Sequence, residues 1–169
     1  MTTHQEIAQK IILKAEASNV MLASAESCTG GMIAAALTDI AGSSVAVDRG
    51  YVTYSNAAKT AMLGVPSDVI DSHGAVSSDV VIAMAEGAVQ HIAADQGIAV
   101  SVSGVAGPGG GSDEKPVGLV WFGLSVRSHD GIQTQSHRMQ FSGNRGDVRT
   151  QATQFALELI LKALNDISA

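Results

Sequence analysis

Aromatic residues and cysteine are scarce in this sequence of 169 residues, which contains one Trp, two Tyr, three Phe and one Cys. A single cysteine excludes an internal disulfide and a zinc site built from cysteines, and it fits a reducing compartment. Charged residues make up 15% of the chain, with no run of Lys or Arg, and the formal net charge is −6. This charge balance argues against a nucleic-acid partner.

Long apolar runs are also absent, and none approaches the length that a bilayer requires, so we expect no membrane partner. Residues 1–6 lack the charged start and apolar core of a signal peptide. These absences predict a soluble, cytoplasmic protein. The chain is instead rich in small apolar residues, with 46% hydrophobic residues and 18 glycines. Its length, without an internal repeat or linker, predicts a single domain over residues 1–169.

Hydrophobic periodicity predicts alternating helices and strands. Apolar residues at helical spacing predict helices over 3–18, 32–40, 56–63, 77–94 and 144–166, with a brief helical turn from Ser67. Short apolar or alternating runs predict strands over 20–24, 45–54, 98–103, 117–126 and 132–141. The last two strands are joined through Asp130-Gly131, which is typical of a hairpin. The pattern predicts an α/β protein, a three-layer α/β/α sandwich with a mixed sheet.

The stretch over residues 25–32, Ala-Glu-Ser-Cys-Thr-Gly-Gly-Met, joins the first predicted strand to the helix that follows it. Such a turn exposes free N–H groups at the positive end of a helix, and here it also carries the hydroxyls of Ser27 and Thr29 and the thiol of Cys28. This arrangement suits a nucleophile, with Ser27 as the first candidate. The alternative is an ordinary N-cap, with Gly30-Gly31 permitting close packing.

A serine nucleophile needs a base, and Lys59 is a candidate because it lies in the first turns of the helix predicted over 56–63. The positive helix end and burial would both lower the pKa of its amine, which would let it accept a proton. The alternative is a solvated surface lysine. Tyr54, at the end of the preceding strand, either shares the same cleft or packs in the core. His73 is the best of five histidines, and no cluster has metal-ligand spacing, so we expect no metal site.

Two further features suit an anion. The glycine-rich loop over 104–116 can present backbone N–H groups to an anion or a planar ligand, or it is a flexible surface loop. It matches neither the P-loop nor the Rossmann glycine pattern. Arg145 and Arg149 lie four residues apart at the start of the last predicted helix, so they share one face beside free N–H groups. They are either a phosphate site or a solvated pair.

Taken together, these stretches resemble the CinA C-terminal-domain family, whose catalytic members are nicotinamide-nucleotide amidases. The resemblance extends over about residues 20–125, and residues 146–151 show a weaker similarity. Several separate motifs in the right order make the resemblance specific. The chain is similar to the stand-alone amidase form. The matching segments are Ala25-Glu26-Ser27-Cys28-Thr29-Gly30-Gly31, Gly50-Tyr51-Val52-Thr53-Tyr54-Ser55-Asn56 with Lys59, Gly74-Ala75-Val76-Ser77, Ser103-Gly104-Val105-Ala106-Gly107-Pro108 and Lys115-Pro116-Val117-Gly118.

The resemblance implies hydrolysis of the carboxamide of nicotinamide mononucleotide to nicotinate mononucleotide and ammonia, in pyridine nucleotide salvage and without a metal or cofactor. Position by position, it makes Ser27 the nucleophile, Lys59 the base and Tyr54 a partner that orients this dyad. From helix-terminus geometry we expect oxyanion donors at the Cys28 or Thr29 N–H groups or on the loop over 104–107. The full set of expected substrate-binding residues is Cys28, Thr29, Gly30, Gly31, Ser103, Gly104, Ala106, Gly107, Arg145 and Arg149.

Three alternatives stay open at this point. Cys28 is a rival nucleophile, since its thiol would lie at the same helix end with a lowered pKa. A non-catalytic nucleotide-binding or interaction module, and an amidase of another small carboxamide, are rival functions. Family members often carry Thr where this chain has Ser103, which leaves the role of that hydroxyl undecided. The small, Ala-rich and Gly-rich chain also predicts a homo-oligomer.

Overall fold

The computed structural model describes residues 3–168, in which five strands form one mixed sheet in the order β2-β1-β3-β4-β5. β1 runs parallel to both β2 and β3, whereas β3, β4 and β5 are antiparallel neighbours. The predicted mixed sheet is therefore confirmed. The strands are β1 (Met21–Glu26), β2 (Val47–Val52), β3 (Gly97–Gly104), β4 (Leu119–Ser128) and β5 (Gly131–Gln140).

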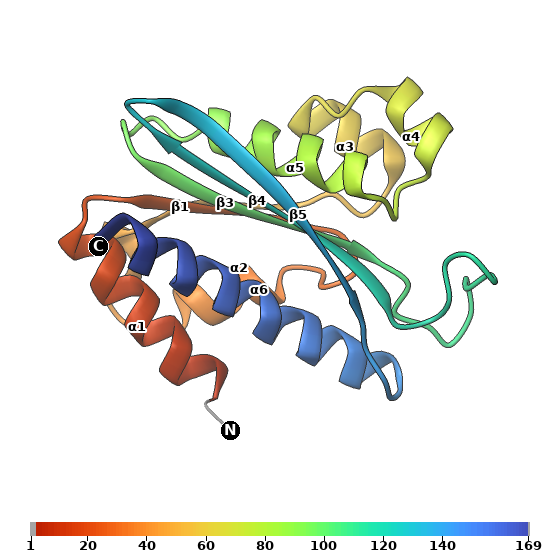
Figure 1. The fold of residues 1–169 in the computed structure, drawn as a ribbon. Helices are drawn as coiled ribbons and strands as arrows, with labels where there is room; N and C mark the ends of the chain where they lie inside the picture. The colour runs from red at the N-terminus through yellow and green to blue at the C-terminus, as the bar shows by residue number, and fades with distance from the viewer. Residues whose placement is uncertain (1–2, 169) are drawn as a thin grey trace.

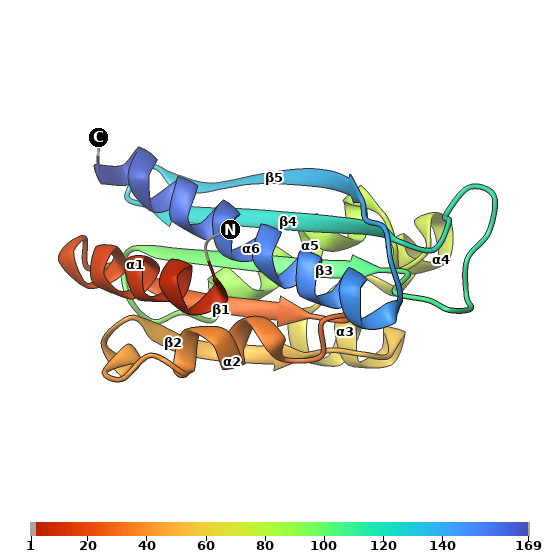
Figure 2. The ribbon, with the colours of Figure 1, turned by 90° about the horizontal axis from the view of Figure 1, so that it is seen from below.

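Helices cover both faces of this sheet, which confirms the three-layer arrangement (Figures 1 and 2). One layer holds α1 (His4–Ala17), α2 (Met32–Thr38) and α6 (Arg145–Ser168), and the other holds α3 (Asn56–Leu63), α4 (Ser67–His73) and α5 (Ser78–Gln90). A short 3-10 turn, η1 (Ser43–Val45), was not predicted. Within residues 3–168, none of the helices combines the length and apolar character needed to cross a bilayer.

β3 is the centre of the hydrophobic core because helices bury it on both faces, as its apolar sequence predicts. Ile98, Val100 and Val102 point into the core shared with α1, α2 and α6. Ala99 belongs to the second core, beneath α5. α5 lies close to the sheet here: a Cβ on Gly123 would come within 2.3 Å of the Val81 carbonyl oxygen. Small residues thus set the short distance between α5 and the sheet.

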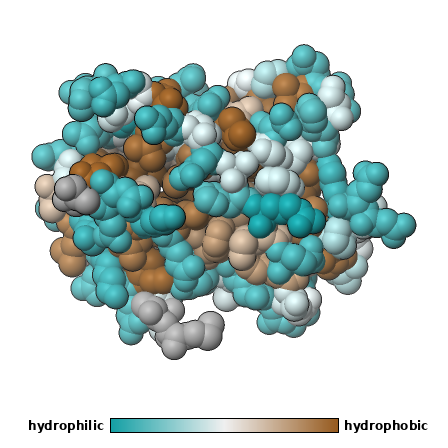
Figure 3. Space-filling model, in the orientation of Figure 1, coloured by the Kyte–Doolittle hydropathy of each residue, from teal (hydrophilic) through white to brown (hydrophobic). Residues whose placement is uncertain are grey.

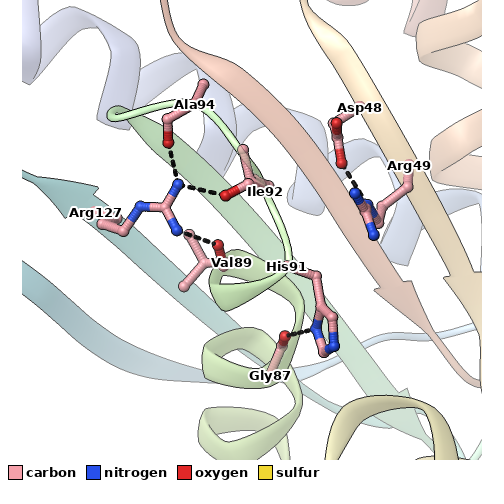
Figure 4. A network of polar contacts seen from close by, with 8 residues as sticks. All are labelled: Asp48, Arg49, Gly87, Val89, His91, Ile92, Ala94 and Arg127. Carbon is pink, nitrogen blue, oxygen red and sulfur yellow. Dashed lines mark hydrogen bonds and ion pairs between the residues drawn. The ribbon is translucent and has the colours of Figure 1, made fainter.

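Arg127 on β4 caps the C-terminal end of α5 (Figure 4). Its guanidinium donates to the carbonyl oxygens of Val89 at 3.0 Å and Ile92 at 2.7 Å, and also to that of Ala94. The last carbonyls of a helix carry partial negative charge and lack partners within the helix, so a cation is favourable there. This contact ties α5 to β4 at the end of the sheet opposite to the one where β1 ends.

The chain leaves β1 and β2 towards opposite faces of the sheet. After β1 it continues into α2 in one layer, and after β2 it continues into α3 in the other (Figures 1 and 2). In open α/β sheets, such a reversal opens a crevice at the carboxyl ends of the strands, where ligands bind. Ser27 directly follows β1, so the fold puts the predicted nucleophile at this crevice.

Candidate active site

The carboxylate of Glu26, at the end of β1, organises the turn that carries Ser27. Glu26 is fully buried and accepts hydrogen bonds from the hydroxyls of Ser24 at 3.0 Å and Thr29 at 2.7 Å. It also accepts the first N–H groups of α2, those of Gly31 at 3.0 Å, Ile33 at 3.1 Å and Ala34 at 2.9 Å. A negative group at a helix N-terminus is stabilising. The sequence analysis missed this role, although a carboxylate at a strand-to-helix turn was a usable signal.

Because Glu26 occupies these donors, the N–H groups of α2 itself are not available to a substrate. Gly31 permits the arrangement, since its φ of +99° lies in the left-handed region that glycine tolerates best. The backbone N–H groups of Cys28 and Thr29 find no acceptor in any other residue of the described range 3–168. Thr29 is fully buried and Cys28 is partly accessible, so of these two donors the Cys28 N–H is the one that a ligand can reach.

Ser27 and Lys59 meet at the crevice although they are far apart in sequence. The Lys59 Nζ atom lies 3.1 Å from Ser27 Oγ and donates to the Thr53 carbonyl oxygen at 2.9 Å. Lys59 is only 1% exposed, and Ser27 is 9% exposed. Ser55 caps α3 by accepting the Ala58 N–H at 3.0 Å, which fixes the helix turn that bears Lys59. The structure thus brings the predicted nucleophile and base within hydrogen-bond distance.

Burial lowers the pKa of the Lys59 amine below its ordinary value of 10.5. Desolvation disfavours the charged form, and among residues 3–168 no carboxylate forms an ion pair with Lys59 to oppose it. A neutral amine can donate one N–H to the Thr53 carbonyl and accept the Ser27 hydroxyl proton on its lone pair. The arrangement is therefore competent for general-base chemistry.

Cys28, the rival nucleophile, is buried, and burial raises the pKa of its thiol to about 11. At pH 7 a pKa of that size leaves about one thiolate in 10,000 molecules. The thiolate is the reactive form of cysteine, so the structure favours the Ser27 hydroxyl over the Cys28 thiol.

A cavity of about 200 Å³ opens beside the dyad at the ends of β1, β2 and β3. One wall comes from the end of β3, where the Ser103 hydroxyl donates to the Ala75 carbonyl oxygen at 2.8 Å. A Cβ on Gly104 would come within 2.7 Å of the Leu119 carbonyl oxygen, so glycine is needed at this corner. The lining residues are Ser27, Cys28, Tyr54, Asn56, Lys59, Ala75, Val76, Ser103, Gly104, Ala106 and Arg145. Asn56, Ala75 and Val76 were not among the residues predicted from the sequence.

Tyr54 and Arg145 form the outer wall of this cavity. The Arg145 guanidinium donates to the Gly107 carbonyl oxygen at 2.7 Å and to the Tyr54 hydroxyl at 3.2 Å. Tyr54 is 64% exposed, so its ring does not pack in the core, and it lines the same cavity as Ser27 and Lys59. The family resemblance implied that Tyr54 orients Ser27 and Lys59. In the structure the Thr53 carbonyl contacts Lys59 Nζ, and the Tyr54 hydroxyl contacts Arg145.

Arg149, the second predicted phosphate ligand, contacts the protein backbone instead. Its guanidinium donates to the carbonyl oxygens of Cys28 at 3.0 Å and Thr29 at 3.2 Å. Of the other predicted substrate-binding residues, Thr29, Gly30 and Gly31 belong to the turn without lining the cavity. Gly107 holds Arg145 through its carbonyl oxygen. The structure thus brings the predicted residues together around Ser27. Half of the predicted substrate-binding residues line the cavity, and the others lie behind its wall.

Other features of the molecule are less suited to this chemistry. Two of the cavities that are larger than the one beside Ser27, of about 370 and about 560 Å³, lie between β5 and α6, where Figure 3 shows hydrophobic residues among hydrophilic ones. Neither is lined by a predicted site residue. The part of the chain that the structure describes contains no group of three His, Cys, Asp or Glu residues placed to hold a metal ion. His73 forms an exposed pair with Asp79 at 3.5 Å and does not line the Ser27 cavity.

Similar proteins of known sequence include named amidohydrolases. The chain is 48% identical over 155 residues to the nicotinamide-nucleotide amidohydrolase PncC of Escherichia coli K12, covering 92% of this chain and 91% of that protein. It is 56% identical over 138 residues to the PncC protein of Enterobacter agglomerans, covering 82% and 81%. A CinA-like protein of Mycobacterium sp. strain MCS is 50% identical over 145 residues, which cover 86% of this chain and 33% of that longer protein.

Solved structures agree with the fold. The competence/damage inducible protein CihA from Agrobacterium tumefaciens matches with a TM-score of 0.87 and 46% identity, over 98% of this chain and 97% of that one. The protein described as competence damage-inducible protein A from Klebsiella pneumoniae matches with a TM-score of 0.89 and 37% identity, over 97% and 98%. The family model described as CinA C-terminal domain matches residues 4–164. The chain therefore belongs to the CinA C-terminal domain family.

Proposed function

We propose that this protein hydrolyses the carboxamide of nicotinamide mononucleotide to nicotinate mononucleotide and ammonia by a Ser-Lys mechanism. The observation that carries the proposal is the distance of 3.1 Å between Ser27 Oγ and the buried amine of Lys59. The similarity to nicotinamide-nucleotide amidohydrolases of the same length supports the choice of substrate. A carboxamide is a weak electrophile, so an activated hydroxyl is what its hydrolysis requires.

In the first half-reaction the neutral Lys59 amine takes the proton of the Ser27 hydroxyl as Oγ attacks the carboxamide carbon. The resulting tetrahedral intermediate carries its negative charge on the former amide oxygen. The protonated lysine then gives its proton to the amide nitrogen, the C–N bond breaks and ammonia leaves. The product of this step is an ester between Ser27 and the nicotinoyl group.

The Cys28 N–H is the donor we assign to the oxyanion. Cys28 lines the cavity and its N–H has no acceptor in another described residue, whereas Thr29 is fully buried outside the cavity wall. The N–H groups of Gly31, Ile33 and Ala34 are held by the Glu26 carboxylate. A fixed backbone donor at the developing charge lowers the barrier without reorganisation during the reaction. Glu26 thus acts indirectly, because it fixes the turn that places this donor.

In the second half-reaction a water molecule attacks the ester, and Lys59 accepts its proton. The second tetrahedral intermediate collapses, Ser27 Oγ leaves as the alcohol with the proton from Lys59, and nicotinate mononucleotide is released. One residue therefore carries protons in both directions, which requires an amine whose pKa lies below that of an ordinary lysine. The lowered pKa of Lys59 meets this requirement.

We place the substrate with its carboxamide at Ser27 and its phosphate at the outer wall. The cavity of about 200 Å³ is small compared with the sites that enclose whole drug-sized ligands, so it suits the pyridine amide end. Arg145 lines this cavity, and within residues 3–168 two of its nitrogens make hydrogen bonds to the protein. Because a guanidinium has five N–H donors, Arg145 retains donors for a phosphate.

The test is ammonia release from nicotinamide mononucleotide, measured without added metal. We expect the Ser27→Ala and Lys59→Met variants to lose at least about 1,000-fold in kcat, because each removes a reacting group. The matched control is Cys28→Ala, which removes the neighbouring thiol and keeps the dyad, and its kcat should stay within about threefold of the native value, since a methyl side chain leaves the backbone donors in place.

Other outcomes decide between the alternatives. Loss of activity in Cys28→Ala with activity kept in Ser27→Ala would assign the nucleophile to the thiol. Release of ammonia from simpler pyridine carboxamides, but not from the nucleotide, would indicate another small-amide substrate. A folded native protein that binds the nucleotide without releasing ammonia would support a binding module instead.

A further inference from the structure

Arg149 contacts the nucleophile turn from the side opposite to Lys59. Its Nε atom donates to the Cys28 carbonyl oxygen at 3.0 Å and its Nη2 atom to the Thr29 carbonyl oxygen at 3.2 Å. It does not line the Ser27 cavity. Glycine at position 30 leaves room for it, since a Cβ there would lie 3.3 Å from Nη2, a tight contact that would require one of the two groups to shift slightly. Among residues 3–168, no carboxylate forms an ion pair with this guanidinium.

The geometry of the peptide bond links these contacts to the Cys28 N–H at the cavity. In a trans peptide the C=O of one residue and the N–H of the next point in opposite directions. The Thr29 carbonyl, which Arg149 holds, shares a peptide with the Gly30 N–H, and this N–H donates to the Ser27 carbonyl at 3.1 Å. The Ser27 carbonyl in turn shares a peptide with the Cys28 N–H. Arg149 therefore anchors the Cys28 N–H through one intervening peptide.

The charge of Arg149 adds to the effect of its position. A hydrogen bond from a cation to a carbonyl is stronger than one between neutral groups. It also polarises the peptide, so the N–H at the other end becomes a better donor. In a site where negative charge develops on oxygen, such a fixed and polarised donor stabilises the transition state more than the ground state.

We propose that Arg149 is a positioning residue of the Ser27 turn, which orients and polarises the Cys28 backbone donor for the tetrahedral intermediate. The inference rests on the proposed function, since it assumes attack by Ser27 on an amide. It replaces the phosphate-ligand role that the sequence alone allowed for Arg149. The two roles differ in what they change: a phosphate ligand acts on KM for phosphorylated substrates, whereas a positioning residue acts on kcat for any substrate.

The experiment compares Arg149→Met and Arg149→Lys with Arg127→Met. Arg127 is a matched control because it also donates to backbone carbonyls but does so at the C-terminal end of α5, away from Ser27. Arg149→Met should lower kcat about 100-fold, because small misplacements of catalytic groups have effects of this size. KM for nicotinamide mononucleotide should change less than about threefold. Arg149→Lys should restore part of kcat, because lysine returns the positive charge but not the two side-by-side donors of a guanidinium. Arg127→Met should lower the melting temperature and leave kcat unchanged.

Nicotinamide riboside, which lacks the phosphate, provides the second arm. If Arg149 positions the turn, Arg149→Met lowers kcat/KM by a similar factor for the nucleotide and the riboside. A loss confined to KM for the nucleotide would overturn the inference and restore the phosphate role. A kcat for Arg149→Met within twofold of the native value would also overturn it.

Hydrogen–deuterium exchange supplies a readout that needs no substrate. Amide exchange in a peptide that spans residues 27–31 should be faster in Arg149→Met than in the native protein, and Arg127→Met should leave it unchanged. If the native protein releases no ammonia, the proposed function fails, and the exchange result alone then decides whether Arg149 anchors the turn. Unchanged exchange at the turn in Arg149→Met would count against the anchoring itself.

Discussion

Replacing Lys59 by Met should change how the stability of the protein depends on pH. Lys59 is 1% exposed and has a lowered pKa in the folded state, whereas in the unfolded chain its pKa returns to about 10.5. Met has a similar length and is apolar, so it removes the titrating amine with little change in volume. Lys59→Met also removes the hydrogen bonds to Ser27 and to the Thr53 carbonyl, which lowers the free energy of unfolding separately from the titration of the amine.

The sign follows from proton binding in the two states. Between the lowered native pKa and 10.5, the unfolded chain holds a proton on Lys59 that the folded protein has released. Stability therefore rises with pH in this window, by at most about 1.4 kcal/mol per pH unit. Below the native pKa the cost of burying the charged amine is present in full, and it disappears as the pH approaches 10.5. Lys59→Met lacks this dependence.

The assay is urea unfolding of both proteins, followed by circular dichroism, at several pH values between 6 and 10. We expect the difference in unfolding free energy, native minus Lys59→Met, to increase steadily with pH. Lys10, which is exposed on α1, supplies the control, because Lys10→Met makes the same substitution without touching the buried site. A flat difference for Lys59→Met would show that its pKa is not lowered and would refute its role as a neutral base.

Two further substitutions test the rest of the site. Glu26→Gln keeps the side-chain volume but turns an NH2 group towards N–H donors, so we expect a loss of about 3 kcal/mol. At this chain length that corresponds to about 6–12 °C in melting temperature, measured by calorimetry, and an unchanged melting temperature would contradict the capping role. Arg145→Met should raise KM for nicotinamide mononucleotide about tenfold, the loss of one charged hydrogen bond. It should leave KM for nicotinamide riboside nearly unchanged, and equal effects on both substrates would exclude a phosphate contact.

The fold was predictable because its signals are local. Thr3 and Ser77 cap helices where the sequence places helix starts, and the buried strand β3 is visible in the sequence as an apolar run between Gly97 and Gly104. The predicted element ends differ from the observed ones by a few residues, as for the helix predicted to about 94, which ends at Gln90. There Arg127, a residue from a distant strand, donates to the carbonyls of Val89 and Ile92, which no sequence pattern around α5 indicates.

The site was predictable only in part. Ser27 and Lys59 follow strands whose carboxyl ends meet, so their positions in the predicted α/β order already favoured proximity. Tyr54 could not be placed, because the direction of a side chain at a strand end depends on the residues packed around it. In the structure it is exposed and bonded to Arg145 from the far end of the chain.

By itself the sequence determined the three-layer fold, the turn that bears Ser27 and the family resemblance, because periodicity, capping residues and motif order are properties of neighbouring residues. Only the tertiary structure decided the contacts of Glu26, Thr53 and Arg149. A carboxylate becomes a helix cap, a carbonyl becomes the partner of an amine, and an arginine becomes a support for a turn through contacts between distant segments. Burial is likewise a property of the packed chain, and burial is what lowers the pKa of Lys59 and raises that of Cys28.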